Sequence, residues 1–324
     1  MRVVSLLASA TEMIAALGCL DQMVGRSHEC DYPEAVQALP VVSQVQIDIN
    51  TSSTEIDAQV KALSRAARAQ EENAAMKALS IYRIDIEQLQ RLRPDIIFTQ
   101  TQCEVCAVSE RDVAQAVSQL IGIQPRIISL APYRLADVWE DVLRVGAALE
   151  RADQAKELVA GYQARLEELC RRTASMPEHP RVAVLEWLDP PMAGGNWTPE
   201  LVEYAGGINL FGEVGAHSPW LAWEDLLAAD PDVIILTPCG YTLQRTLEDV
   251  PLLEARPGWS SLRAVQSGRV FAIDGNQYFN RSGPRLVDSA EILATLLFGS
   301  DMAPDIDHAS WKNISSTEKT FPAR

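Results

Sequence analysis

The sequence predicts an α/β protein of two similar lobes that are joined by a long helix, with a ligand cleft between the lobes. Three observations lead to this prediction. The stretch from Tyr133 to Thr173 carries apolar residues at helical spacing and contains no proline. A short pattern of helix, Pro-Asp turn and buried strand occurs once on each side of that stretch. The chain of 324 residues is long enough to form two cores.

The repeated pattern is the most specific of these signals. In the first copy Glu87 lies seven residues before Pro94, and in the second copy Glu224 lies seven residues before Pro231. Each proline is followed by an aspartate and an apolar strand. The same pattern of helix, Pro-Asp turn and strand on both sides of a long helix indicates two lobes of similar construction.

The long helix itself fixes the predicted domain boundaries. At about 1.5 Å per residue, a helix of this length spans roughly 60 Å, which exceeds the width of a small domain. Gly146 and Gly161 would weaken it by only ~1 kcal/mol each. We therefore expect a first lobe at residues 1–132, a connecting helix at 133–175, a second lobe at 176–299 and a loose polar tail at 300–324.

Helices and strands alternate in both predicted lobes, which makes each of them Rossmann-like. The first lobe is expected to contain strands at 2–7, 23–26, 96–99 and 126–130, an extended piece at 40–42, and helices at 12–17, from Ser53 or Thr54 to about 79, and at 109–120. Ser9 or Thr11 would cap the first helix. The second lobe is expected to contain strands at 181–186, 233–236 and 269–273, and helices that end near 204, 253 and 298.

Composition excludes several classes of partner. The net charge of −16 argues against nucleic acid and against an anionic membrane surface. No run of about eighteen apolar residues exists, so we expect no membrane insertion. The apolar stretch at Val3–Ala10 is too short for a signal peptide, and six scattered cysteines suit a reducing compartment, so a cytoplasmic location is expected. A true start further upstream would make the protein periplasmic instead.

Ligands of parallel α/β sheets bind beyond the carboxyl ends of the strands, and this rule selects the loops with the most unusual residues. The candidate ligand-binding side chains in these loops are Ser9, Thr11, Trp187, Trp197, Tyr241, Tyr278 and Arg281. The aromatic rings could present flat faces to a macrocycle, or they could simply be packing anchors. The guanidinium group of Arg281 could bind a carboxylate or phosphate, or form an internal salt bridge.

The same loops carry thiols and an imidazole. Cys103, Cys106, Cys239, Cys30 and His28 form the candidate metal set, because thiolate and imidazole suit zinc, iron or copper(I). The Cys103-Glu104-Val105-Cys106 spacing occurs in zinc sites and in redox pairs. Free thiols that never meet are the alternative.

The order of several motifs resembles one known family. The opening Val3-Val4-Ser5-Leu6-Leu7-Ala8-Ser9-Ala10-Thr11-Glu12, the repeated Pro-Asp units, Gly268–Asp274 and Ser282–Arg285 are similar to the helical-backbone class of substrate-binding proteins. These proteins serve ABC importers of cobalamin, haem and iron chelates, and the cobalamin-binding branch is the most similar. The resemblance covers about residues 2–298. It implies two lobes, a rigid connecting helix and a bound corrinoid or related metal chelate.

The resemblance also implies a partner. In that family a surface glutamate on each lobe docks onto arginines of the permease, and Glu87 and Glu224 hold the matching positions in the repeated unit. The alternative is that each is an acid near a helix N-terminus, which the helix dipole favours.

Two functional hypotheses follow, together with a weaker third. The first is a binding protein for a corrinoid or another metal chelate, linked to an ABC transporter and without catalysis. The second is a cytosolic metal or redox protein of the same fold, in which Cys103, Cys106, Cys239 and Cys30 hold zinc or iron or cycle through a disulfide. The third is an enzyme that acts on a cofactor precursor, but no residue pattern supplies its general base.

Overall fold

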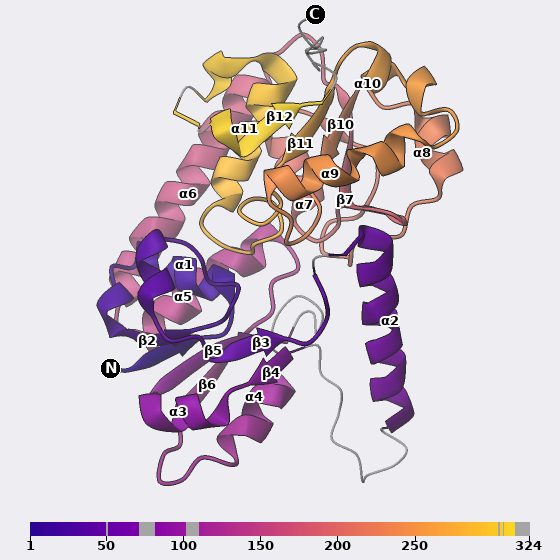
Figure 1. Cartoon of the computed structure of the whole chain (residues 1–324). Coiled ribbons are helices and arrows are strands. Elements are labelled where there is room, and N and C mark those ends of the chain that lie inside the picture. Colours follow the sequence, from indigo (N-terminus) through magenta and orange to yellow (C-terminus); the bar gives the residue numbers. More distant parts are fainter. Residues whose placement is uncertain (50, 71–81, 102–109, 304, 307, 315–324) are drawn as a thin grey trace, which may run out of the picture. The chain divides into compact units, whose positions relative to one another are not determined.

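The computed structural model describes residues 1–49, 51–70, 82–101, 110–303, 305–306 and 308–314 (Figure 1). The chain divides into two compact units, Met1–Gly161 and Tyr162–Arg324. The boundary falls within helix α6 (Ala152–Thr173). Both units are α/β, as the sequence predicts.

Unit 1 is built on a parallel sheet with strand order β2-β1-β5-β6. These strands are β1 (Val3–Ser5), β2 (Met23–Arg26), β5 (Ile96–Gln100) and β6 (Arg126–Leu130). A separate antiparallel pair consists of β3 (Ser43–Val45) and β4 (Tyr82–Ile84). The helices are α1 (Ala8–Ala16), α2 (Ser53–Gln70), α3 (Ile86–Leu92), α4 (Glu110–Val117) and α5 (Leu135–Ala148). Helix α2 begins at Ser53, where the sequence predicts it, and the last part of that predicted helix lies outside the described residues.

Unit 2 repeats the plan with additions at both edges of its sheet. The strand order is β12-β11-β10-β7-β8, with β9 also paired to β7, and β7, β10 and β11 are mutually parallel. The strands are β7 (Arg181–Leu188), β8 (Pro191–Ala193), β9 (Ile208–Asn209), β10 (Val233–Leu236), β11 (Val270–Ile273) and β12 (Trp311–Asn313). The helices are α7 (Thr198–Tyr204), α8 (Trp223–Ala229), α9 (Leu243–Glu254), α10 (Arg263–Gln266) and α11 (Leu286–Phe298).

The Pro-Asp turn of unit 1 fastens three elements together. Asp95, just before β5, accepts the backbone N–H of Arg2 through its carboxylate at 2.7 Å and donates its own N–H to the Arg2 carbonyl at 2.8 Å. The Nε of Arg2 donates to the carbonyl of Leu92, the last residue of α3, at 2.7 Å. This contact satisfies a helix-terminal carbonyl that has no partner within the helix. The turn therefore fixes β5 beside β1.

Unit 2 makes the same set of contacts. The carboxylate of Asp232 accepts the N–H of Arg181 at 2.9 Å, and its own N–H donates to the Arg181 carbonyl at 2.9 Å. A guanidinium nitrogen of Arg181 donates to Ala229, the last residue of α8, at 2.8 Å. The residue after each helix is left-handed, Arg93 at φ 45° and Asp230 at φ 42°. The repeat seen in the sequence is thus a repeat of contacts.

The predicted continuous helix at 133–173 is broken, which corrects that expectation. Helix α5 ends at Ala148 and α6 begins at Ala152, with Glu150 left-handed at φ 61°. The N–H of Arg151 donates to the Gly146 carbonyl at 2.7 Å and that of Glu150 to Ala147 at 3.4 Å, which is a Schellman ending. The sequence does not signal this ending, because a glutamate holds the position that glycine usually takes.

Gly146 permits the close turn between the two helices. A Cβ at this position would lie 2.4 Å from the Cβ of Ala155 and 3.1 Å from the carbonyl oxygen of Arg151. No side chain fits there without displacing the start of α6. The glycine therefore serves close packing and does not merely weaken a helix.

Two further expectations need correction. Helix α1 begins at Ala8, earlier than predicted, and no side chain caps it. The predicted tail at 300–324 contains an ordered strand, because β12 pairs antiparallel with β11 and Trp311 packs edge-on against Phe271 at 5.9 Å. A strand of three residues is too short to show a periodic pattern in the sequence.

A carboxylate is buried in helix α5. Asp141 is 2% exposed, and its Oδ1 accepts from Arg144 at 2.8 Å while its Oδ2 has no hydrogen-bond partner in the described structure. Burial raises the pKa of Asp141 to about 7, although Arg144 and the backbone N–H of Ala131 act in the opposite direction. The interior of unit 1 therefore favours the protonated acid.

We expect Gly146→Ala to lower the free energy of unfolding by about 1–3 kcal/mol, because the added methyl group overpacks the contact with Ala155. Urea denaturation measures the change. Gly161→Ala is the matched control: nothing lies within 4 Å of its added Cβ, so it should raise stability by up to about 1 kcal/mol. Equal effects of the two variants would contradict the role of Gly146.

The raised pKa of Asp141 predicts a pH dependence of stability. Between about pH 4 and pH 7 the folded chain holds a proton that the unfolded chain releases, so this group's contribution to stability falls as pH rises through that window. Asp141→Asn should remove this loss and gain stability relative to wild type between pH 5 and pH 8, measured by urea denaturation. Asp153→Asn, at an exposed position, is the control, and a pH-independent difference for Asp141→Asn would refute the prediction.

Candidate functional site

The loops after β7, β10 and β11 meet at one edge of the unit 2 sheet, because these strands are parallel. A Cβ at Gly275 would lie 2.2 Å from the Pro238 carbonyl oxygen, so the loop after β11 crosses the loop after β10 in contact with it. The Asn280 amide donates to the carbonyls of Thr237 at 2.9 Å and Gly275 at 3.0 Å. These contacts hold the loops that carry the candidate side chains in fixed positions relative to one another.

An aromatic pair occupies this edge. The rings of Trp187, near the end of β7, and Tyr241, after β10, lie 5.2 Å apart. The indole Nε1 of Trp187 is buried and makes no hydrogen bond within the described structure, which is uncommon for a buried donor. The structure thus brings together two of the predicted ligand-binding residues.

A charged group holds the tyrosine in place. The guanidinium carbon of Arg245 lies 4.6 Å from the Tyr241 ring centroid, and its Nη2 donates to the Tyr241 hydroxyl at 3.4 Å. Its Nη1 bonds Asp249 at 2.7 Å. Burial raises the pKa of Tyr241 to about 12, so the phenol is neutral at physiological pH. We call Trp187, Tyr241, Arg245 and Asp249 the aromatic–arginine cluster.

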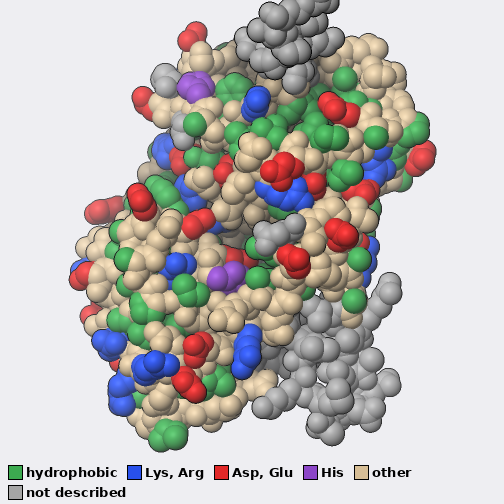
Figure 2. All heavy atoms as spheres, in the orientation of Figure 1, with side chains coloured by type: hydrophobic (Ala, Val, Ile, Leu, Met, Phe, Trp, Pro, Cys, Tyr) green, Lys and Arg blue, Asp and Glu red, His purple; other side chains and the backbone are tan. Residues whose placement is uncertain are grey.

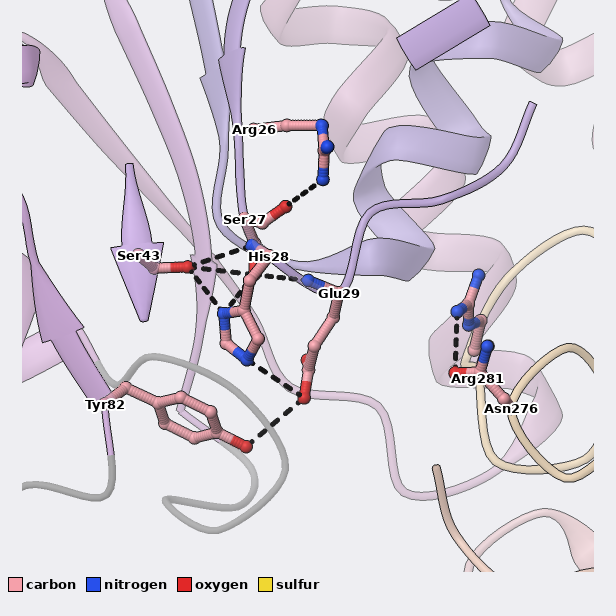
Figure 3. Close-up of polar contacts among 8 residues, drawn as sticks. All are labelled: Arg26, Ser27, His28, Glu29, Ser43, Tyr82, Asn276 and Arg281. Carbon is pink, nitrogen blue, oxygen red and sulfur yellow. Dashed lines mark hydrogen bonds and ion pairs between the residues drawn. The ribbon is translucent and has the colours of Figure 1, made fainter. Parts of the chain in front are cut away.

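Two buried arginines follow β11. The Nη2 of Arg281 donates to the Asn276 side-chain oxygen at 2.9 Å, and Figure 3 shows this pair. The Nη1 of Arg285 donates to Gln277 at 3.0 Å, and its guanidinium lies 5.4 Å from the ring centroid of Tyr278. In both of these hydrogen bonds the acceptor is the oxygen of a neutral side-chain amide.

Trp197 has a structural contact at the same edge. It is 4% exposed, and its indole N–H donates to the Phe279 carbonyl at 2.6 Å. Phe279 is left-handed at φ 63°, and its N–H donates to the Ser289 hydroxyl at 3.0 Å. Trp197 therefore supports the loop that carries Tyr278 and Arg281, and its contact with a ligand stays a prediction.

Two predicted ligand-binding residues of unit 1 lie in helix α1. Ser9 is 1% exposed and Thr11 is fully buried. The hydroxyl of Thr11 lies 3.3 Å from the Leu7 carbonyl and 3.0 Å from the sulfur of Cys30. Cys30 is itself a buried free thiol, 3.8 Å from the Ser5 carbonyl. Ligand contact by Ser9 and Thr11 stays a prediction as well.

His28 lies just after β2 in a polar network that Figure 3 shows. Its Nδ1 is 2.9 Å from the Ser43 hydroxyl, and its Nε2 is 3.9 Å from a carboxylate oxygen of Glu29. The Tyr82 hydroxyl donates to the same carboxylate at 3.3 Å. Burial, and then the charge of Arg26, lower the pKa of His28 below its ordinary value. A neutral imidazole keeps one ring nitrogen able to bind a metal.

The predicted metal set is not assembled in the described part of the chain. No group of three or more His, Cys, Asp or Glu residues there could hold a metal ion. Cys239 is a half-buried free thiol of unit 2, whereas Cys30 is enclosed in unit 1. Cys103 and Cys106 lie outside the described residues. The structure therefore gives no support to a zinc or iron site on these cysteines.

The two predicted docking glutamates hold equivalent places. Glu87 is the second residue of α3 and Glu224 the second residue of α8, and both are exposed. Glu87 forms an ion pair with Arg91 at 3.5 Å, in which both side chains are largely exposed. Such surface pairs contribute little to stability, about 0–1 kcal/mol.

Comparison with known proteins agrees with this architecture. The profile of the family described as Periplasmic binding protein matches residues 3–277. The chain is 23% identical over 300 residues to the Vitamin B12-binding protein of Vibrio cholerae, covering 91% of this chain and 88% of that protein. It is 22% identical over 302 residues to an uncharacterized ABC transporter substrate-binding lipoprotein of Bacillus subtilis, covering 92% and 80%.

Solved structures share the fold. The apo form of the periplasmic heme-binding protein RhuT from Roseiflexus sp. RS-1 matches with a TM-score of 0.65 and 22% identity, covering 93% of this chain and 98% of that one. The periplasmic vitamin B12 binding protein of Vibrio cholerae matches with a TM-score of 0.62 and 20% identity, covering 91% and 96%. The fold and its two repeated units are those of a substrate-binding protein. Because the family profile covers most of its length, the chain belongs to the Periplasmic binding protein family.

These findings confirm the family resemblance and correct the expected location. The cytoplasmic expectation is wrong: the matched family is described as periplasmic, and the Bacillus subtilis relative is a lipoprotein. The cytosolic metal or redox hypothesis assumed that location, so it is not supported.

No helix in the described part of the chain combines the length and apolar character that a membrane span needs. On the face that Figure 2 shows, acidic and basic side chains are interspersed.

Sequence reasoning missed Arg245 and Asp249. Tyr241, Arg245 and Asp249 follow one another at intervals of four, and α9 places Arg245 and Asp249 on one face. That spacing, directly after a strand end, was a signal that could have found them.

We expect the imidazole of His28 to titrate below its ordinary pKa of 6.5, because burial and the Arg26 charge both disfavour its protonated form. NMR titration of the ring, with His28→Gln to assign the signal, measures it. Arg26→Gln should raise this pKa only in part, because burial is the larger cause. A His28 pKa above 6.5 would contradict the environment described here.

Proposed function

We propose that the protein binds a corrinoid or another metal chelate, such as haem, at the loops after β7, β10 and β11 of unit 2. The observation that carries the proposal is the aromatic–arginine cluster, in which Trp187 and Tyr241 stand 5.2 Å apart at the strand ends. Aromatic side chains bury a large apolar area and stack on flat conjugated rings. The unpaired Nε1–H of Trp187 adds a donor for a polar ligand group.

The buried arginines fit the polar groups of such ligands. Haem carries carboxylates and cobalamin carries a phosphate, and either group forms charge-assisted hydrogen bonds with guanidinium. Arg281 is 8% exposed and Arg285 7% exposed, and a neutral side-chain amide orients each of them. Groups that are fixed in advance lose little conformational entropy when a ligand binds.

The relatives supply the ligand class. Proteins named for vitamin B12 binding and for heme binding share the fold and most of the chain length. Members of this family that carry such names are binding proteins, so catalysis forms no part of the proposal. We further propose that Glu87 and Glu224 dock the protein onto an ABC permease, as their equivalent exposed places in α3 and α8 suggest.

Titration of the purified protein with cyanocobalamin and with haemin, followed by tryptophan fluorescence, tests the ligand class. We expect saturable quenching with one of them. Trp187→Ala should weaken binding about tenfold, because loss of one stacked indole removes roughly 1–2 kcal/mol of apolar contact.

Trp220→Ala is the matched control, because Trp220 is a 55% exposed tryptophan of the same unit outside the aromatic–arginine cluster. It should leave the dissociation constant unchanged. Equal losses in both variants would remove the cluster from the ligand site. Absence of binding to either ligand would refute the proposed ligand class.

A further inference from the structure

Unit 1 exposes an apolar side chain whose backbone is held by a neighbouring helix. Ile121 is 81% exposed, more than any other large apolar side chain in the described part of the chain. Single exposed apolar residues are ordinary on protein surfaces and need no explanation by themselves. The contacts around Ile121 set it apart.

The side chain of Gln90 holds the backbone of Ile121 from both sides. The amide nitrogen of Gln90 donates to the Ile121 carbonyl at 2.9 Å, and the amide oxygen accepts the Ile121 N–H at 2.7 Å. Gln90 belongs to α3 and lies three residues after Glu87, so the two side chains are neighbours on one helix surface. The backbone of Ile121 is therefore held by the same helix that carries Glu87.

An apolar hollow adjoins this position. It lies between α4 and β6, and its lining includes Ala114, Val117, Leu120, Ile123 and Ile127. The hollow borders Ile121 through its lining residues Leu120 and Gly122, and the helix that holds the Ile121 backbone also carries Glu87. Protein interfaces combine an apolar centre and a polar rim.

The matching helix position of unit 2 has a different residue and a different contact. Leu227 lies three residues after Glu224, as Gln90 does after Glu87. A Cβ at Gly258 would lie 3.0 Å from the Leu227 side chain, so Leu227 packs closely against a glycine, whereas Gln90 binds the backbone of Ile121. The two units share the contacts of their Pro-Asp turns, but the residue three positions after the glutamate differs between them.

We propose that Glu87, Ile121 and the adjoining hollow form one interaction surface for a permease segment that carries a basic side chain next to an apolar one. The inference rests on the proposed docking function and extends it to an apolar contact on unit 1 alone. Glu87 is 89% exposed, and its pair with Arg91 at 3.5 Å is weak enough for a partner's cation to replace. The carboxylate of Glu87 would bind the basic side chain of the permease segment, and Ile121 and the hollow would contact the apolar side chain next to it.

Photo-crosslinking in cells that express the full chain and the permease of the same organism tests this surface. Benzoylphenylalanine is placed at Ile121, at Asp225 beside Glu224, and at Ile208 as an exposed apolar control. We expect crosslinks to the permease from positions 121 and 225 but not from 208, and Glu87→Gln should reduce the yield at 121 at least fivefold.

The outcomes separate this inference from the docking proposal. Permease crosslinks from position 225 without any from 121 would overturn the apolar surface and leave docking standing. Absence at both positions would overturn both. A crosslink from 121 to a second copy of the chain would overturn the choice of partner.

Ile121→Glu, at an exposed position, should slow ligand uptake at least fivefold with an unchanged ligand dissociation constant. Undiminished uptake would contradict the inference.

Discussion

The architecture depends on a carboxylate that receives the backbone N–H at the start of a strand. Asp95 does this for Arg2 and Asp232 for Arg181, and each arginine in turn satisfies the last carbonyl of a short helix. A charge-assisted hydrogen bond to a backbone donor is stronger than a neutral one, so these contacts set which strands become neighbours. Once β10 lies beside β7, Trp187 and Tyr241 emerge at the same edge. The candidate ligand site is thus a consequence of a contact at the other end of the strands.

The two α/β units could be predicted from the sequence because their signals are local. A glutamate near a helix start, a Pro-Asp turn and an apolar run each act over a few residues, and both copies fold as they indicate. The continuous helix could not be excluded, because its break depends on Glu150 in a left-handed conformation and on Gly146 meeting Ala155. Neither the conformation nor the contact has a signature in periodicity. Strand β12 was missed for a similar reason, since only its pairing with β11 orders it.

The candidate site likewise has a part that the sequence could predict and a part that it could not. The rule for strand ends selects Trp187, Tyr241, Tyr278 and Arg281 as candidates, because it uses topology alone. It could not distinguish a side chain that faces outward from one that packs inward, and Trp197 and Thr11 have internal contacts. The cysteines show the limit of reasoning from residue type. Cys30 has the chemistry of a metal ligand, but its sulfur lies 3.0 Å from the Thr11 hydroxyl inside unit 1, where it behaves as a small buried side chain.

The repeat also shows which parts of a duplicated unit are free to differ. Contacts that join helix, turn and strand are the same in both units, because each of them satisfies a backbone group at a strand start or a helix end. Side chains outside those contacts have no such role. Gln90 and Leu227 hold equivalent helix positions, yet one binds the backbone of Ile121 and the other packs against Gly258. Two surfaces that share a glutamate but differ in the residue beside it can recognise different partner segments. Fixed internal contacts with divergent surface residues therefore give the two units distinguishable surfaces beside their glutamates.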